Sequence, residues 1–229
     1  MKTLTIILTL SFFSIQLSAQ RIVEESMPVS SNQEIRLDFD FADDIFIKAW
    51  DKSEVYVKAT VNINEGKDNN KFKFISRKGF GYISIKSEIE DLNKLSTNCR
   101  TIIIKNGDTT IINGMGAQIN LTFEVFMPPD VELALETING NIEIKGLTGP
   151  MEIETINGEI DLYISSDHKA DLSMSTINGT MYTNLDPEFI SEKDNMCKVG
   201  GDVDTKLNGG GVDIDLETIN GTIYLRKAK

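Results

Sequence analysis

The sequence is poor in the residues that most metal and redox sites require. It has two cysteines, one histidine and one tryptophan in 229 residues. Structural zinc sites use four Cys or His ligands and catalytic ones usually three, so the composition argues strongly against a zinc site. Cys99 and Cys197 also lack the Cys-x-x-Cys spacing of redox and zinc motifs. In an oxidising compartment these two thiols could pair in a disulfide or stay separate, and their sequence surroundings favour neither alternative.

Basic clusters and long apolar runs are also missing. The formal net charge is −12, which argues against nucleic acid or anionic lipid as a partner, because both attract basic patches. Residues 1–19 combine Lys2, an apolar stretch of about ten residues and a small residue at Ala19. A spanning helix needs about 20 apolar residues, so this pattern predicts a cleaved signal peptide instead. We therefore expect an exported protein, periplasmic or at the cell surface or extracellular, with no membrane span after cleavage.

The tetrapeptide Thr-Ile-Asn-Gly occurs four times in the chain. The copies end the segments 131–140, 149–158, 170–179 and 212–221, and in each segment apolar residues alternate with Glu, Asp or Ser. Strict alternation over seven or eight residues predicts a half-buried β-strand. A second alternating stretch follows each copy, so the repeat unit is strand, corner, strand and second corner, about 20 residues in all.

Two architectures can use such a unit. In a meander of hairpins, each Asn-Gly would form a type I′ turn. In a β-solenoid, each unit would be one coil, and identical residues of stacked coils would meet about 4.8 Å apart. The repetition of the whole tetrapeptide with its flanking apolar face favours the solenoid. Residues 198–207 would then form a degenerate coil between the third and fourth copies, and the isoleucine of each copy would turn inward.

The Asn and Gly of each copy are predicted to form the structural corners of the coils. The glycines would adopt backbone angles that other residues avoid. The asparagines would hydrogen-bond to one another up the stack. The residue that follows Asn-Gly varies between copies, so an N-glycosylation sequon does not explain the repeat. The corner residues are Asn139, Gly140, Asn157, Gly158, Asn178, Gly179, Asn220 and Gly221.

The wider pattern resembles a known protein family. The stretch FEVFMPPDVELALETINGNIEIKGLTGPMEIETINGEIDL (123–162) follows IFIKAWDKSEVYVKA (45–59). Together they resemble the bacterial "putative adhesin" family of exported β-strand-repeat proteins, also called toastrack domains. The resemblance implies an all-β, single-domain, right-handed parallel β-helix over residues 20–229 and implies little about chemistry. Within it, residues 20–130 read as diverged coils with insertions and residues 131–229 as regular coils.

No catalytic set stands out in the sequence. His168 is adjacent to Ser165, Ser166 and Asp167, whereas the members of a catalytic triad converge from separate segments, so it is interpreted as a turn residue. Acid pairs such as Asp202/Asp204 are about 6.6 Å apart on one strand face, a separation that glycoside hydrolysis can use. Solvent-facing strand positions are usually polar in any case, so these pairs are interpreted as a solvated acidic wall. We expect no catalytic residue, metal or cofactor.

These observations predict a non-enzymatic adhesin or envelope interaction protein. Its partner would be a glycan or an envelope protein bound on a flat stacked face, and the sequence does not indicate an oligomeric state. One alternative is a polysaccharide-active β-helix enzyme that uses paired carboxylates such as Asp202 and Asp204. Another is an accessory protein of envelope-stress signalling. Trp50 is interpreted as a corner residue that packs over the end of a coil rather than as a sugar-stacking residue.

Overall fold

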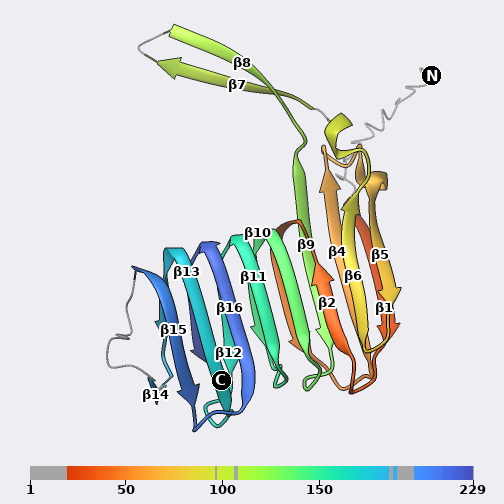
Figure 1. The fold of residues 1–229 in the computed structure, drawn as a ribbon. Helices are drawn as coiled ribbons and strands as arrows, with labels where there is room; N and C mark the ends of the chain where they lie inside the picture. The colour runs from red at the N-terminus through yellow and green to blue at the C-terminus, as the bar shows by residue number, and fades with distance from the viewer. Residues whose placement is uncertain (1–19, 96, 106–107, 186–187, 190–198, 229) are drawn as a thin grey trace, which may run out of the picture.

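A computed structural model describes residues 20–95, 97–105, 108–185, 188–189 and 199–228. The predicted signal peptide and Cys197 lie outside these residues. The described residues form β-strands with two short 3-10 helices, η1 (Asn69–Lys71) and η2 (Leu92–Lys94) (Figure 1). In chain order, the strands are β1 (Arg21–Pro28), β2 (Glu34–Asp38), β3 (Phe41–Ala49), β4 (Glu54–Ile63), β5 (Phe72–Lys78), β6 (Tyr82–Ile89), β7 (Thr97–Lys105), β8 (Asp108–Gly116), β9 (Ile119–Met127), β10 (Leu133–Lys145), β11 (Met151–Asn157), β12 (Ile160–Ile164), β13 (Ala170–Thr183), β14 (Glu188–Phe189), β15 (Val199–Leu207), β16 (Val212–Asn220) and β17 (Ile223–Lys227).

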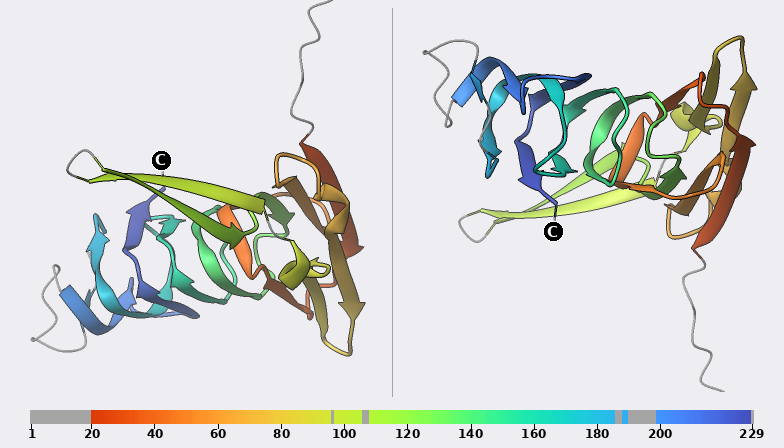
Figure 2. Two further views of the ribbon diagram at one scale, coloured as in Figure 1. Left: turned by 90° about the horizontal axis from the view of Figure 1, so that it is seen from above. Right: turned by 90° about the horizontal axis from the view of Figure 1, so that it is seen from below.

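The strands make two walls that enclose one apolar core, and the chain passes from one wall to the other around it (Figure 2). Wall A consists, in spatial order, of β5, β6, β2, the first half of β10, β11, β16, the first half of β13, β15 and β14. Wall B consists of β1, β4, β9, β3, the second half of β10, β12, β17 and the second half of β13. Strands β7 and β8 form a separate hairpin.

The four Thr-Ile-Asn-Gly copies stack in parallel and in register in wall A. Thr137 pairs with Thr155, Thr155 with Thr218, and Thr218 with Thr176. The last copy in the chain therefore lies between the second and the third, next to β11 on one side and β13 on the other (Figure 1). The all-β prediction is confirmed, and identical residues do meet across neighbouring strands.

A continuous parallel β-helix is not confirmed, because the sheet is mixed and the coils do not follow chain order. The predicted coil at 198–207 is wrong: β15 runs antiparallel to β13, and Gly201 pairs with Thr176. The reason lies in the turn after β15, where Asn208, Gly209 and Gly210 all have positive φ. This tight turn reverses the direction of the chain, so β15 and β16 run in opposite directions. Because β16 is parallel to the other stacked strands, β15 is antiparallel to them. At the other end of the molecule, β4 and β9 are antiparallel, as are β5 and β6.

The alternating apolar residues fill the core, as the sequence predicts. Leu133, Leu135, Ile142 and Ile144 of β10 are all buried, and the corresponding residues of the neighbouring coils meet them in register. Each fully buried Leu or Ile contributes about 1.5–3 kcal/mol relative to an exposed one. Aromatic rings close the core near β2 and β9, where Phe39 stacks on Phe123 with a centroid distance of 4.2 Å.

Candidate interaction face

The corner asparagines form a hydrogen-bonded ladder along the stack. Asn157 Nδ2 donates to Asn139 Oδ1 at 3.1 Å. Asn220 Nδ2 donates to Asn157 Oδ1, and Asn178 Nδ2 donates to Asn220 Oδ1, both at 2.9 Å. The hydrogen bonds expected between stacked asparagines are therefore present. Their order follows the order of the strands in space, with Asn220 between Asn157 and Asn178.

The predicted backbone angle is present in one corner glycine, and the other three are needed for a different reason. Among the four, Gly140 has a positive φ, of 145°, whereas Gly158, Gly179 and Gly221 do not. A Cβ on Gly158 would lie 2.0 Å from the carbonyl oxygen of Gly140, and one on Gly221 would lie 1.8 Å from that of Gly158. A Cβ on Gly179 would lie 1.7 Å from the carbonyl oxygen of Gly221. The stacked backbones approach so closely that no side chain fits between them.

The isoleucine of each corner faces solvent, so the prediction that it turns inward is wrong. Ile138 is 39% exposed, Ile156 41% and Ile177 63%, and Ile219 is half-buried. The preceding threonine of each copy is buried, so alternation continues through the tetrapeptide and places the isoleucine on the outer face. We call Ile138, Ile156, Ile219 and Ile177, in spatial order, the isoleucine ladder.

Carboxylates line the outer face of wall A beside this ladder. Glu136, Glu154 and Glu217 pair in register, each two residues before an isoleucine of the ladder. Glu152 and Asp215 form the next pair along the same face. We call these five residues the carboxylate ladder. Within the described part of the chain, no Lys or Arg forms an ion pair with any of them.

Crowding of like charges changes the acidity of this face. Partial burial raises the pKa of Glu154, and repulsion from neighbouring carboxylates, Glu136 first among them, raises it further. Burial also raises the pKa of Asp215, and the charge of Asp204 on β15 adds to the shift. A nearby cation would stabilise the charged form of both carboxyls, but no Lys or Arg of the described chain forms an ion pair with either.

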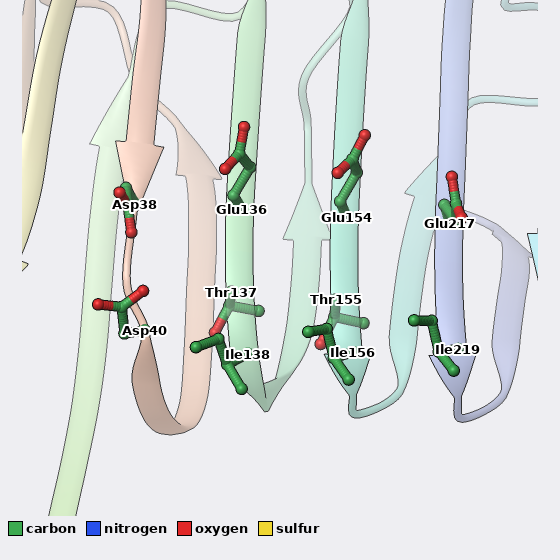
Figure 3. A pocket seen from close by; sticks show the side chains of 10 residues that line it. All are labelled: Asp38, Asp40, Glu136, Thr137, Ile138, Glu154, Thr155, Ile156, Glu217 and Ile219. Atoms are coloured by element: carbon green, nitrogen blue, oxygen red, sulfur yellow. The ribbon is translucent and has the colours of Figure 1, made fainter.

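A shallow groove of about 210 Å³ lies along three members of each ladder, over β10, β11 and β16. Figure 3 shows Glu136, Glu154 and Glu217 in one row and Ile138, Ile156 and Ile219 in a second row nearer the corners. Asp38 and Asp40 line the end of the groove near β2. There Lys86 Nζ lies 2.6 Å from Asp38 Oδ2 and 3.7 Å from Asp40 Oδ2. The groove is therefore charge-paired at that end and uncompensated over β10, β11 and β16.

Wall B differs because several of its charges are paired. Its outer face carries three ion pairs with N–O distances of 2.9, 2.7 and 2.7 Å, namely Lys58 with Glu124, Lys145 with Glu143, and Arg226 with Asp161. Two of its aromatic rings each have a cation over them, whereas Tyr182 is 45% exposed. Lys145 Nζ lies 4.5 Å from the centroid of Tyr163, and the guanidinium carbon of Arg226 lies 4.4 Å from that of Tyr224. The stack thus has one face with several ion pairs and another whose central carboxylates have none within the described chain.

The other residues considered from the sequence do not line this groove, although Asp202 and Asp204 of β15 lie on the same face of wall A. His168 lies in the turn between β12 and β13, where burial lowers its pKa, an effect that the Asp167 charge opposes. Trp50 Nε1 donates to Glu54 O at 2.8 Å, and the ring lies 5.5 Å from that of Phe126, which agrees with a packing residue. Asp202 accepts a hydrogen bond from Ser175 Oγ at 2.7 Å.

Three further predictions concern metals, membranes and the disulfide. The described residues contain no group of three or more His, Cys, Asp or Glu placed to hold a metal ion. No helix within them is long and apolar enough to cross a membrane. Cys99 belongs to β7, but Cys197 is outside the described residues, so the pairing of the two thiols stays a prediction.

Comparison with known proteins gives similarity in structure alone. No protein-family model matches the chain, and no curated protein matches it. A solved "putative cell adhesion protein" from Clostridium sporogenes is similar over 91% of this chain and 100% of its own, with 12% identity and a TM-score of 0.51. A "putative adhesin" from Bacteroides fragilis aligns over 92% of this chain and 99% of its own, but its 8% identity and TM-score of 0.20 are too low to support a conclusion about the fold. The chain therefore has a fold similar to that of the Clostridium protein, in agreement with the "putative adhesin" resemblance of its sequence.

Proposed function

We propose that this chain is an exported, non-enzymatic interaction protein of the adhesin type, which binds a glycan or protein partner through wall A. The observation that carries the proposal is the alignment of the isoleucine ladder with the carboxylate ladder along one groove. The predicted signal peptide supports export, and the similarity to the Clostridium protein supports the fold on which the face is built.

The two ladders supply different parts of a binding free energy. Covering exposed isoleucine contributes about 25 cal/mol for each Å² of apolar surface removed from water. The carboxylates add long-range attraction and orientation, which set the association rate and the choice of partner more than the affinity. Wall B offers less of both, because three of its carboxylates already pair with cations and its exposed Ile22 and Tyr182 lie on strands far apart in the wall. We therefore expect a partner to gain more binding free energy on wall A than on wall B.

Mutation of the ladder tests this function. Residues 20–229 would be applied to arrays of purified glycans and envelope proteins, as wild type and with Ile156→Ser plus Ile177→Ser. We expect at least one ligand whose binding weakens tenfold or more in the double variant. Ile22→Ser is the matched control, since Ile22 is 58% exposed on β1 of wall B. Binding that is absent from both arrays, or equal in all three proteins, would contradict the proposal.

Location is tested separately. Cell fractionation combined with protease treatment of intact cells should place the protein in the periplasm or on the surface. A protein that stays in the cytosol with residues 1–19 intact would contradict the export part of the proposal, and the binding part would stand.

A further inference from the structure

We infer that the partner of wall A is a basic amphipathic α-helix, lying along the stack axis and crossing the strands. This inference rests on the proposed function and names its partner class. It depends on three properties of the face: the spacing of the isoleucine ladder, the sign of its uncompensated charge, and the order of the rows beside it.

Spacing favours a helix over an extended segment. Neighbouring rungs of the isoleucine ladder lie on hydrogen-bonded strands, about 4.8 Å apart. A helix with one apolar residue per turn repeats every 5.4 Å or so, a mismatch of about 0.6 Å per rung. A strand along the same axis repeats on one face every 6.6 Å or so, and its side chains lose register within two rungs. Four rungs therefore match about three turns of helix.

Charge then selects the kind of helix. The carboxylate ladder has no cationic partner within the described chain, and two of its members, Glu154 and Asp215, have raised pKa values. A partner that brings Lys or Arg relieves this repulsion. A second copy of this chain would oppose carboxylates to carboxylates, and the formal charge of each copy is −12. An anionic lipid surface is disfavoured for the same reason.

The order of rows fixes where the basic residues of the helix lie. The isoleucine ladder runs between the carboxylate ladder on one side and the asparagine ladder on the other. A helix whose apolar stripe covers the isoleucines thus meets carboxylates along one flank only. The other flank meets neutral amides that already hydrogen-bond to each other. The best-matched helix has Leu-like residues once per turn, Lys or Arg along one flank, and small polar residues along the other.

Synthetic peptides test this inference on the protein of residues 20–229. The probe is an 18-residue helix-forming peptide with Leu once per turn and Lys along one flank, labelled for fluorescence anisotropy. The controls are a scrambled peptide of the same composition and a peptide with Glu in place of Lys. We expect the amphipathic basic peptide to bind at least tenfold more tightly than either control. Its affinity should also fall as salt rises, because the contact includes ion pairs.

Protein variants then place the peptide on the face. Ile156→Ser and the pair Glu154→Gln with Glu217→Gln should each weaken peptide binding tenfold or more. Ile22→Ser and Glu143→Gln, both on wall B, should leave it unchanged. If the scrambled peptide binds equally well, the contact is unspecific attraction and the inference is overturned. If no peptide binds but an array ligand depends on Ile156 and Ile177, the inference falls and the proposed function stands. If neither ligand nor peptide depends on the ladders, both fall.

Discussion

At the scale of single residues, three of the four corner glycines are required by backbone contact rather than by backbone angle. A Cβ on Gly158 would overlap the carbonyl oxygen of Gly140, which is part of the neighbouring strand and cannot rotate away. Gly158→Ala should therefore cost several kcal/mol of unfolding free energy, in the range of severe packing defects. Gly81→Ala is the matched control, since Gly81 has a φ of 84° but open space around its Cβ position.

Chemical denaturation of the two glycine variants separates the two effects. Gly81→Ala should cost about 1 kcal/mol, the penalty for a left-handed backbone alone. Glu159→Gln, at an exposed position in the same corner, should change stability by less than about 0.5 kcal/mol. Equal costs for Gly158→Ala and Gly81→Ala would show that the stacked carbonyl yields, and the close-approach explanation would be lost.

The asparagine ladder makes a graded prediction. Asn157 has an asparagine partner on each side, whereas Asn178 hydrogen-bonds to Asn220 alone within the ladder. A net hydrogen bond contributes about 0.5–1.5 kcal/mol. Asn157→Ala should therefore destabilise the protein about twice as much as Asn178→Ala. Thermal denaturation followed by circular dichroism measures the difference, and a larger loss at Asn178 would show that the ladder is not the stabilising feature.

At the scale of elements, the carboxylate ladder predicts an unusual pH dependence. The pKa of Glu154 is raised in the folded protein, so between its ordinary value and its folded value the native state binds more protons than the unfolded chain. The contribution of Glu154 to stability therefore decreases as pH rises through that window and is unchanged below it. Removing this charge should stabilise the protein at neutral pH, and the gain should disappear in acid.

Melting temperatures of wild type and Glu154→Gln at pH 7.5 and pH 4 check this sign. The difference between the two proteins isolates Glu154 from groups whose pKa is lowered, such as Asp171, which Lys206 stabilises in its charged form. We expect Glu154→Gln to melt higher than wild type at pH 7.5 and at about the same temperature at pH 4. A lower melting temperature at pH 7.5 would mean that Glu154 does have a cationic partner in the folded chain.

The elements themselves could largely be read from the sequence, but their neighbours could not. Alternation such as Leu133, Leu135 and Thr137 identifies strands and their buried faces, because a period of two leaves one face apolar. The outward direction of the isoleucines could also have been inferred from the sequence, although we predicted the opposite. Thr137 already occupies the inner face, so the next residue, Ile138, must point outward unless the alternation breaks. Four nearly identical strands, by contrast, carry no information about which pairs with which, since each fits any other equally well in register.

At the scale of the whole molecule, the position of the last coil has consequences for folding. β16 pairs with β11 on one side and with β13 on the other, and β17 pairs with β12 and β13. The final residues of the chain therefore complete the middle of the stack rather than its end. In a solenoid whose coils follow chain order, loss of the last coil removes one set of nearest-neighbour contacts and leaves the remaining coils in place.

Truncation after residue 211 distinguishes these two topologies. The truncated chain would lose the strands that join β11 and β12 to β13, and the asparagine ladder would be interrupted between Asn157 and Asn178. We expect residues 20–211 to lose cooperative unfolding or to melt more than about 10 °C below the full chain, since several core residues lose their partners at once. Circular dichroism and size-exclusion chromatography of both proteins measure this. A truncated protein that melts cooperatively near the full-length temperature would place the last coil at an end of the stack. Because β16 must insert between strands about 40 to 60 residues earlier in the chain, folding should also be slow, as long-range pairing generally is.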